Sequence, residues 1–382
     1  MDFTISPEQA SFQDLAKNFA KDQLAPYAAT WDRDEIFPIS ALRKAAELGF
    51  GSVMVRPEFG GSDLKRIDSV LIFEELAKGC PSTAGYLSVH NMVAYLLDRY
   101  GSSHQHQKWL PKLTTMEWLS SYCLTEPEAG SDAASLATKA IREGDYYKVS
   151  GTKAFISGGG VSDLYLCMVR TGEPGTKGIT ALLIEKGMPG LSFGKREEKM
   201  GWRCQPTTMV VLDDVRVPVA NRLGEEGDGF KIAMVGLDGG RLNIAACSLG
   251  GAHACLELAL KYTNERKQFG KKLNEYQAIQ FRLADMATEL VAARLMVHKA
   301  ACLLDEKSAD DTLFCAMAKR FATDVGFKVV NEALQLHGGY GYIRDYQVER
   351  YLRDLRVHQI LEGTNEIMRV IIARKLLEMY KE

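Results

Sequence analysis

The stretch from Ile279 to Ala300, IQFRLADMATELVAARLMVHKA, carries the longest periodic signal in the chain. Its apolar residues recur alternately four and three positions apart, as on one face of an α-helix. They are Ile279, Leu283, Met286, Leu290, Ala293, Val297 and Ala300. A seam of this length can build a helix bundle or a subunit interface. A buried core helix within one chain gives the same pattern, so the stretch alone leaves both interpretations open.

The residue composition and the hydrophobic periodicity of the chain change at two points. Residues 1 to about 120 contain amphipathic helical runs; the first begins with the capping box Ser6-Pro7-Glu8-Gln9 and is expected to end before Pro26. From Tyr122 to about Gly227 come short runs rich in β-branched and aromatic residues, which are typical of a small sheet or barrel. The expected strands include Tyr146–Val149, Lys153–Ser157, Leu164–Arg170, Ile179–Glu185 and Met209–Leu212. After Gly227 the helical period returns and stays.

This order of helix, strand and helix predicts a fold that is mainly α with a central β domain. The expected division is an N-terminal helical domain in residues 1–120, a middle β-barrel domain in 121–230 and a C-terminal helical domain in 231–382. We find no internal repeat and no low-complexity segment in the sequence.

The composition excludes several classes of function. A net charge of −2 argues against a nucleic-acid partner, because neutralising phosphates requires clustered positive charge. The eight cysteines form no CxxC pair and no HExxH or ExxH motif occurs, so we expect no metal site and a reducing compartment. No apolar run approaches the ~20 residues that cross a bilayer. A helix signal begins within six residues of the start, so we expect no membrane span and no targeting segment in this sequence.

An acid stands at a break between two helical segments near the C-terminus. Glu362 follows the apolar pair Ile360-Leu361 and precedes Gly363, which supplies backbone freedom, and Thr364 or Asn365 can cap the helix that follows. A carboxylate held against apolar neighbours ionises less readily, so its pKa rises towards the range useful for a general base. A solvated Glu at a helix junction is the alternative interpretation.

Two stretches of the β segment combine hydroxyl groups with glycine. Leu124–Asp132, LTEPEAGSD, places Thr125 and Ser131 on either side of a Pro-containing turn. Lys153–Gly160, KAFISGGG, places an aromatic ring and a hydroxyl group two positions apart, hence on one face of a strand. Such a pair can line a flat heteroaromatic ring, although turns of this composition are common.

Glycines also interrupt the helical part of the chain. In GLDGGR (236–241) and QLHGGYGY (335–342) they indicate a close backbone approach to a ligand or to another helix. His337 is equally compatible with a satisfied core histidine and with a ligand. The basic cluster that includes Arg266 and Lys267 would suit a small phosphate ligand or a solvated helix end. No GxGxxG, Walker or GxSxG motif accompanies these stretches.

Taken together, the stretches LTEPEAGSD, KAFISGGG, RKQFG, QLHGGYGY and ILEGTNEIMR resemble the acyl-CoA dehydrogenase family over nearly the whole chain. The resemblance implies a helical domain, a β-barrel domain and a C-terminal four-helix bundle, usually assembled as a homotetramer. It also implies FAD bound between the β and helical domains, with part of its site contributed by a neighbouring subunit.

Carried over residue by residue, the resemblance implies three groups of site residues. Glu362 matches the catalytic base; the alternative base position of some relatives is Gly240 here, which cannot take a proton. The residues that resemble cofactor contacts are Tyr122, Leu124, Thr125, Ser131, Phe155, Ile156, Ser157, Arg266, Tyr276, Gln277, Gln335, Leu336, His337, Gly338, Gly339, Thr364, Asn365 and Glu366. The residues that resemble substrate contacts are Ser131, Asp238, Gly239, Gly240, Arg241 and Arg374.

The implied reaction is removal of the α-proton of an acyl thioester by Glu362 while the β-carbon delivers hydride to the flavin. Electron-transferring flavoprotein is the implied electron acceptor. The implied compartment is the mitochondrial matrix in a eukaryote or the cytoplasm in a bacterium.

The segments ILEGTNE, AFISGGG and CSLGGAHA are most similar to those of family members acting on short branched acyl groups. Leu361 stands where many relatives have Tyr, which leaves space for a methyl branch at the α-carbon. We therefore expect isobutyryl-CoA, an intermediate of valine catabolism, as the substrate. Because a pocket discriminates one methylene by only ~1–3 kcal/mol, 2-methylbutyryl-CoA or straight short chains are alternatives. An acyl-CoA oxidase and a non-catalytic helical scaffold are the rival classes.

Overall fold

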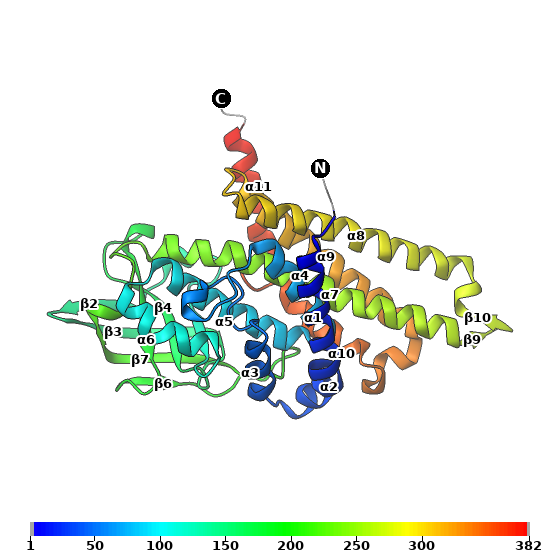
Figure 1. Cartoon of the computed structure of the whole chain (residues 1–382), viewed down its shortest axis with the longest axis horizontal. Helices are drawn as coiled ribbons and strands as arrows, with labels where there is room; N and C mark the ends of the chain where they lie inside the picture. The colour runs from blue at the N-terminus through cyan, green and yellow to red at the C-terminus, as the bar shows by residue number, and fades with distance from the viewer. Residues whose placement is uncertain (1–3, 380–382) are drawn as a thin grey trace.

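The computed structural model describes residues 4–379; the strands of its main sheet lie at one end of the molecule, and long helices extend from there to the other end (Figure 1). The N-terminal helices are α1 (Pro7–Phe19), α2 (Ala25–Asp34), α3 (Ile39–Glu47), α4 (Arg66–Gly79), α5 (Pro81–Tyr100) and α6 (Ser103–Thr114). The predicted capping box is confirmed, because the Gln9 N–H donates to Ser6 Oγ at 3.1 Å and the Gln9 side chain accepts from the Ser6 N–H.

The first helix ends before Pro26, as predicted, but the chain does not leave the helical path there. A π-helical turn, Ala20–Leu24, joins α1 directly to α2. Pro26 is the second residue of α2, and the change of hydrogen-bonding pattern in the π-helical turn directly before it accommodates a residue without an N–H.

The central segment forms an eight-stranded sheet. Its strands are β1 (Ser120–Cys123), β2 (Lys139–Glu143), β3 (Tyr146–Ser157), β4 (Leu164–Arg170), β5 (Ile179–Glu185), β6 (Leu191–Phe193), β7 (Thr207–Pro218) and β8 (Arg222–Leu223). Hydrogen bonding runs in the order β6-β7-β3-β2-β4-β5-β8, with β1 parallel to β4. Within residues 4–379 no pairing joins β6 to β8, so the expected barrel is observed as a sheet with two free ends.

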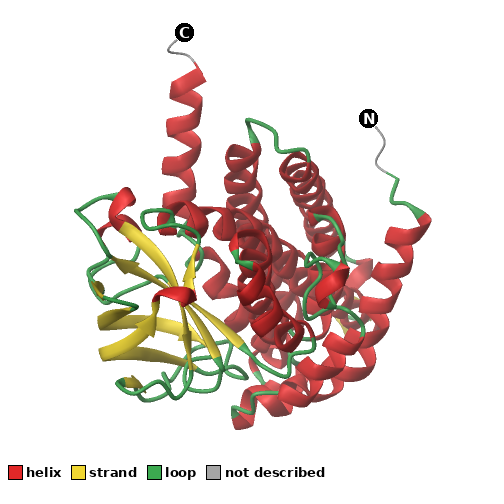
Figure 2. Ribbon diagram, turned by 60° about the vertical axis from the view of Figure 1, so that its left-hand side comes forward, coloured by secondary structure: helices red, strands yellow, loops and turns green. Residues whose placement is uncertain are grey.

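The C-terminal part returns to helix and builds the other half of the molecule (Figure 2). Its helices are α7 (Gly229–Glu265), α8 (Gln277–Asp305), α9 (Asp311–His337), α10 (Val348–Arg356) and α11 (Asn365–Met379). A short hairpin of β9 (Lys267–Gln268) and β10 (Lys271–Lys272) joins α7 to α8. The predicted seam is confirmed in α8, whose buried residues include Met286, Leu290, Ala293, Val297 and Ala300.

Helix α7 is the centre of the packing. It lies against α4, α5, α8 and α9, and one hydrophobic core joins the N-terminal and C-terminal helices around it. Within the described chain it is the one helix long and apolar enough to cross a membrane by length and composition, although no unbroken apolar run in the sequence indicated it. Since 78% of its most apolar window is buried inside the protein, packing against other helices accounts for this composition.

The two changes of composition and periodicity lie close to two loops, the loop between α6 and β1 and the loop between β8 and α7. The boundaries of the proposed division into residues 1–120, 121–230 and 231–382 fall just past these loops, within the first two residues of β1 and of α7. A second core cluster links α5, α6 and the N-terminal half of α7 to one face of the sheet, so the β domain is fixed against the helices. This contact brings β1 close to the turn that carries Glu362.

Candidate active site

Glu362 lies in a turn between the 3₁₀ helix Val357–Gln359 and α11. Glu362 has φ +54° and Gly363 φ +94°, so two consecutive residues adopt the left-handed conformation that the glycine tolerates and the glutamate ordinarily avoids. Thr364 caps the next helix, since its Oγ1 accepts from the Ile367 N–H at 3.3 Å. Within the described residues the Glu362 N–H donates to no protein acceptor, which leaves it free for a ligand oxygen.

The carboxyl group of Glu362 lies against α7 at Gly240. Its Oε2 is shut off from solvent and has no hydrogen-bond partner. A methyl group at Gly240 would overlap Oε2 and would also lie 2.5 Å from Cε of Met92, so the glycine lets the base pack on the helix in this position without moving either side chain. The predicted close approach at 236–241 is thus an approach to the base at Gly240, and at Gly236 and Gly239 an approach to side chains of the neighbouring helices α5 and α4.

The electrostatics of this position favour a base that works near neutral pH. Burial raises the pKa of Glu362 to about 7, while the positive charges of Arg241, Lys319 and Arg66 oppose the shift. The first effect exceeds the sum of the others because the carboxyl group has lost its water without gaining a direct hydrogen bond.

Two cations hold the main chain on either side of the base. Arg241 Nε donates to the carbonyl of Glu362 at 3.2 Å, and Lys319 Nζ donates to the carbonyl of Gly363 at 2.8 Å. Arg241 is itself held by an ion pair with Asp238 at 2.7 Å, and Asp238 accepts from Thr312 at 2.9 Å. Arg241 and Asp238 were predicted near the substrate; in the structure they support the turn that carries Glu362.

Tyr122 links the β domain to α7 near Glu362. Its hydroxyl donates to the carbonyl of Ala233 in α7 at 3.3 Å. Burial raises the pKa of Tyr122, and the charge of Glu362 adds to the shift, so the phenol and the carboxyl group lie in one electrostatic environment. Leu124 is buried in the core between the sheet and α5.

The two hydroxyl-bearing stretches of the β domain lie side by side. The Ala154 N–H donates to the carbonyl of Thr125 at 2.9 Å, and Lys153 forms a buried ion pair with Glu126 at 2.7 Å. The structure therefore unites LTEPEAGSD and KAFISGGG, which are separate in sequence, into one surface.

Within this surface the individual residues differ in exposure. Phe155 is 71% exposed at an irregularity of β3 and has φ +56°, so its ring stands free for a ligand. Ser131 is exposed and Ser157 half-buried, whereas the side chain of Ile156 belongs to the interior of the β domain. Ile156 can therefore meet a cofactor only through its backbone.

A second site lies at the far end of α7. Arg266, Gln335, Leu336, His337, Gly338 and Gly339 all line one cavity of about 530 Å³. Nothing lies within 4 Å of a methyl group built on Gly338 or Gly339, so this backbone is open to a ligand. Tyr276 and Gln277 stand next to it, at the start of α8. Gly240 and Arg266 are separated by roughly 39 Å along the helix, at about 1.5 Å per residue, so this cavity is remote from Glu362.

In this structure His337 is a core residue. It is buried, its Nδ1 pairs with the Ala333 carbonyl at 2.7 Å, and its ring stacks on Tyr262 with the centroids 4.5 Å apart. Burial lowers its pKa, so it is uncharged at neutral pH. It shapes the cavity wall through packing.

The remaining predicted residues lie on or beside α11. The side chain of Asn365 is buried and occupied, donating to Thr323 at 2.9 Å and to Asp324 at 2.7 Å and accepting from Lys319 at 2.9 Å. A cofactor contact of Asn365 would have to come from its backbone. Glu366 and Arg374 are exposed on α11.

Three neighbours of the base were not found from the sequence: Arg66, Met92 and Lys319. Lys319 did leave a signal, since it occupies a position of the buried stripe of α9 between Cys315 and Thr323. Arg66 opens a helix that is buried on almost every side, which a charged residue ordinarily avoids. Met92 has no signal that distinguishes it from other core methionines.

The site thus combines a carboxyl group whose Oε2 is buried and unpaired with a remote cavity lined by Arg266 and open glycine backbone. This arrangement is that of an enzyme with a general base and a separate binding region for an anionic group. The N-terminal, middle and C-terminal domains of acyl-CoA dehydrogenases match residues 6–117, 121–215 and 227–377. The chain belongs to the acyl-CoA dehydrogenase family and is a flavin oxidoreductase that dehydrogenates acyl-CoA.

Individual relatives agree with this assignment over nearly the full chain. It is 56% identical to mitochondrial isobutyryl-CoA dehydrogenase of Bos taurus over 98% of this chain and 90% of the relative, and 55% identical to that of Dictyostelium discoideum over 97% and 90%. The structure of butyryl-CoA dehydrogenase from Megasphaera elsdenii superimposes with a TM-score of 0.95 at 40% identity, covering 99% of this chain and 100% of that one. PigA with FAD and proline superimposes with a TM-score of 0.95 at 32% identity, covering 98% and 99%.

The residues present fit FAD, on which the family generally depends. The exposed ring of Phe155 beside half-buried Ser157 suits a flat ring system. Arg266 and the open backbone of Gly338 and Gly339 suit a pyrophosphate, because a guanidinium group and main-chain N–H groups both bind phosphate oxygens.

Proposed function

We propose that the chain dehydrogenates isobutyryl-CoA to methacrylyl-CoA as a step of valine catabolism. The observation that carries the proposal is the Oε2 of Glu362, buried, without a partner and fitted against Gly240. The names of the two relatives at 55–56% identity support the choice of acyl group. Leu361, directly before the base, supports it further, because a Leu side chain leaves room that a Tyr would fill.

In the proposed mechanism Glu362 takes the α-proton of the thioester. Its raised pKa reduces the gap between base and carbon acid. The free N–H of Glu362 would bind the thioester carbonyl and stabilise the negative charge that develops there. Arg241 and Lys319 hold the two carbonyls of the turn, so that this N–H and the carboxyl group keep a fixed relation.

We propose FAD as the cofactor of this chain. When bound, FAD supplies the acceptor for the hydride that leaves the β-carbon. Tyr122, Thr125, Ser131, Phe155, Ser157, Thr364 and Glu366, with the backbone of Leu124, Ile156 and Asn365, would hold the ring end. Arg266, Tyr276, Gln277 and residues 335–339 would hold the pyrophosphate and adenosine end. Since roughly 39 Å of helix separates the two groups in one chain, one FAD would be held by two subunits.

We propose further that the chain forms a homotetramer and passes electrons to electron-transferring flavoprotein.

The proposed contacts with the substrate are Ser131, Asp238, Gly239, Gly240, Arg241 and Arg374, with Arg374 at the CoA end. The mitochondrial relatives support the mitochondrial matrix as the compartment in a eukaryote; the counterpart in a bacterium is the cytoplasm.

The first test is the flavin spectrum of the purified protein. The protein should be yellow, and isobutyryl-CoA added without oxygen should bleach the flavin band. If no short acyl-CoA bleaches it, the proposed reaction is wrong. If 2-methylbutyryl-CoA bleaches the flavin and isobutyryl-CoA does not, 2-methylbutyryl-CoA is the substrate. Hydrogen peroxide formed at the rate of turnover in air would identify an oxidase.

The second test assigns the base. Glu362→Gln should retain the yellow colour and acyl-CoA binding but lose flavin reduction by several powers of ten. Glu257→Gln, which changes an exposed glutamate of α7, is the matched control and should reduce its flavin normally. Normal turnover by Glu362→Gln would remove Glu362 from the mechanism.

A further inference from the structure

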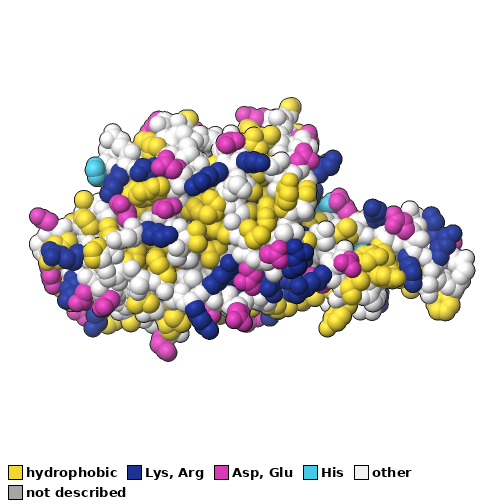
Figure 3. Space-filling model, turned by 90° about the horizontal axis from the view of Figure 1, so that it is seen from below, with side chains coloured by type: hydrophobic (Ala, Val, Ile, Leu, Met, Phe, Trp, Pro, Cys, Tyr) yellow, Lys and Arg dark blue, Asp and Glu magenta, His cyan; other side chains and the backbone are white. Residues whose placement is uncertain are grey.

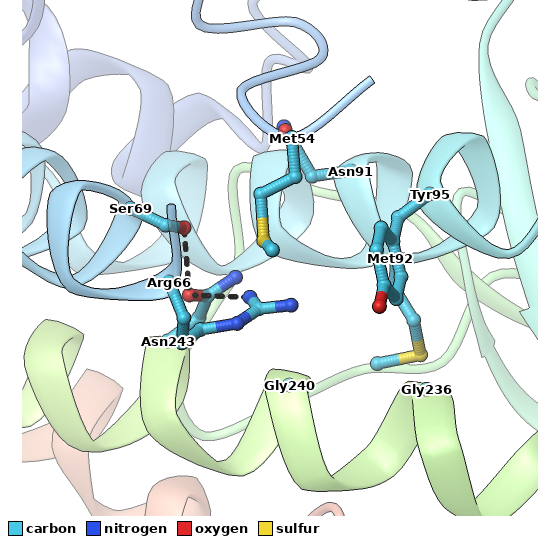
Figure 4. Close-up of a pocket in the computed structure, with 9 residues that line it drawn as sticks. All are labelled: Met54, Arg66, Ser69, Asn91, Met92, Tyr95, Gly236, Gly240 and Asn243. Atoms are coloured by element: carbon cyan, nitrogen blue, oxygen red, sulfur yellow. Dashed lines mark hydrogen bonds between the residues drawn. The ribbon is translucent and has the colours of Figure 1, made fainter. Parts of the chain in front are cut away.

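A small cavity lies between α4, α5 and α7, beside Gly240 (Figure 4). We call it the inner cavity; its wall includes Met54, Met92, Tyr95, Arg66, Asn243 and Gly240. Its volume is about 10 Å³, which is about the room that one water molecule requires. Because Gly240 also receives the carboxyl group of Glu362, the inner cavity begins where the reacting carbons of a substrate would lie.

The polar side of the inner cavity is fixed. Arg66 is 6% exposed, and its guanidinium group donates to Asn243 Oδ1 at 3.4 Å, an oxygen that also accepts from Ser69 at 3.0 Å. Its main-chain N–H donates to Asp305 at 2.8 Å, and its guanidinium group lies over the ring of Tyr95 at 5.7 Å. A methyl group at Gly239 would overlap the guanidinium group, which therefore rests directly on α7.

The charge of Arg66 is not neutralised by contact. Among the described residues no carboxylate forms an ion pair with it, and its Nε has no hydrogen-bond partner although it is buried. Ion pairs nearby go to other groups, such as Asp238 to Arg241. A buried cation in this state is poorly matched by further apolar groups, because a methylene supplies neither a compensating charge nor an acceptor for its unpaired N–H group.

The apolar side of the inner cavity is adaptable. Met54 and Met92 are unbranched thioethers with several rotatable bonds, and such side chains turn at little cost. Met92 reaches to 2.5 Å from the methyl position of Gly240 and so occupies the entrance. Room for an acyl group can be made when the methionines turn, whereas Arg66 is anchored at both its main chain and its head group.

From this contrast between adaptable and fixed walls, we propose that Arg66 is the end wall of the acyl pocket and restricts the substrate to short acyl groups. The inference rests on the proposed function and identifies the residue that sets chain length. A four-carbon acyl group would occupy the space vacated by Met92. Each further methylene of a longer straight chain would lie against the guanidinium group or force it away from Asn243.

The test compares chain lengths in three proteins purified as holoenzymes. In the unaltered protein kcat/KM should fall steeply from butyryl-CoA to hexanoyl-CoA. Arg66→Met removes the charge and keeps the length of the side chain; we expect it to raise the ratio of kcat/KM for hexanoyl-CoA over isobutyryl-CoA by about tenfold or more, chiefly through KM. Arg66→Lys keeps a charge in the pocket and should leave the ratio close to that of the unaltered protein.

The outcomes separate a specificity role from a structural one. If Arg66→Met loses activity equally on every chain length and its unfolding midpoint falls, Arg66 has a packing role and the proposal is overturned. A flat chain-length profile in the unaltered protein overturns it as well, even if no Arg66 variant folds. Arg66→Gln, which can still donate to Asn243, replaces Arg66→Met if that variant is insoluble, and exposed Arg33→Met is the control for loss of a positive charge.

Failure of the proposed function would look different. In that case no acyl-CoA of any length would bleach the flavin of the unaltered protein. If isobutyryl-CoA bleaches it and the chain-length profile is flat, the reaction stands and only the role of Arg66 is wrong.

Discussion

At the scale of single residues, the site depends on one buried carboxyl group whose charge is opposed by burial and supported by three cations. Arg241 and Lys319 touch the backbone of the turn, and Arg66 lies against Gly239, next to the glycine that receives the base. None of the three hydrogen bonds to Oε2, which remains available to accept a proton. The attraction of the three cations thus offsets part of the effect of burial without blocking the atom that reacts.

We predict that flavin reduction by isobutyryl-CoA follows the titration of Glu362. Burial raises its pKa to about 7, so below that pH the carboxyl group is protonated and cannot act as a base. The second-order rate of bleaching should therefore rise about tenfold per pH unit up to about pH 7 and level off above it. Stopped-flow absorbance between pH 5 and 9 measures this. A profile that is already flat at pH 5 would show that the group that titrates is a normal carboxylate.

The same shift predicts a cost in stability. A carboxyl group whose pKa is raised on folding holds its proton more tightly in the folded state, so stability falls as pH rises from the unfolded pKa of 4.5 to the folded value of about 7. The full loss is on the order of 3 kcal/mol. The difference in unfolding midpoint between Glu362→Gln and the unaltered protein, both with flavin bound, should therefore increase in favour of Gln between pH 5 and 8. A constant difference would contradict the raised pKa.

Lys319 provides an independent test of this electrostatic account. Burial lowers its own pKa to about 8, so it is still charged at pH 7, and its charge lowers the pKa of Glu362. Lys319→Met should move the midpoint of the bleaching profile upward by about one pH unit. Lys328→Met, on the same helix but in an exposed pair with Glu289, is the matched control and should leave the midpoint unchanged. If both variants shift the profile equally, the effect is one of net charge and not of position.

At the scale of elements, α7 unites the molecule because its glycines admit other groups at contact distance. Gly240 admits the base, Gly239 the guanidinium group of Arg66, and Gly250 the main chain of α4. A methyl group at Gly250 would overlap the carbonyl oxygen of Glu74, a backbone atom that cannot turn aside. The central helix is thus a surface on which neighbouring elements lie unusually close.

We predict that Gly250→Ala destabilises the protein although alanine favours helix. The overlap with the α4 backbone should cost about 1–3 kcal/mol, which exceeds the gain of about 1 kcal/mol in helix propensity. Gly251→Ala is the matched control on the same helix, because its methyl group would meet Cδ1 of Leu355 at 2.7 Å, the end of a side chain that can move. The urea midpoint of Gly250→Ala should be the lower of the two. Equal midpoints would mean that α4 and α7 separate readily.

The elements were largely predictable from sequence because each has a strong periodic signal. The strands Leu164–Arg170 and Ile179–Glu185 were placed residue for residue, and five of the seven predicted seam residues are buried in α8. The π-helical turn Ala20–Leu24 was missed, since no sequence rule separates it from ordinary helix. Two runs expected as separate strands are one strand, β3, because its register shifts near Gly151 interrupt the pattern without interrupting the strand.

The site was predictable only in part, since spacing along the chain says little about contacts across it. Glu362 and Gly240 could be paired from the resemblance. Arg66 and Lys319 could not be assigned to the site, because their proximity to Glu362 arises from the packing of α4 and α9 on α7. For the same reason His337 remained ambiguous until its stacking on Tyr262 was seen.

At the scale of the whole molecule, the chain exposes several apolar surfaces that another chain could cover. Helix α11 stands away from the body with Leu376 and Leu377 exposed, and Phe269 in the β9–β10 hairpin is 96% exposed (Figures 1 and 2). The face seen in Figure 3 carries hydrophobic patches both at its middle and on the extension formed by the long helices. Contiguous apolar surface of this kind is typical of interfaces between subunits.

We predict that each flavin site is completed by two chains, and hybrid oligomers test this. Arg266→Ala should lose flavin on desalting, because it removes a cation of the cavity at the far end of α7, while its Glu362 stays intact. Glu362→Gln should keep flavin and be inactive. When the two variants are co-expressed with different affinity tags and the hybrid is isolated, some sites would combine an intact Glu362 from one chain with an intact Arg266 from the other. The desalted hybrid should then be active without added FAD, although each parent alone is not.

If one chain holds the whole cofactor, every site in the hybrid carries one of the two defects. The hybrid would then be no more active than its parents, and the two-chain site would be excluded.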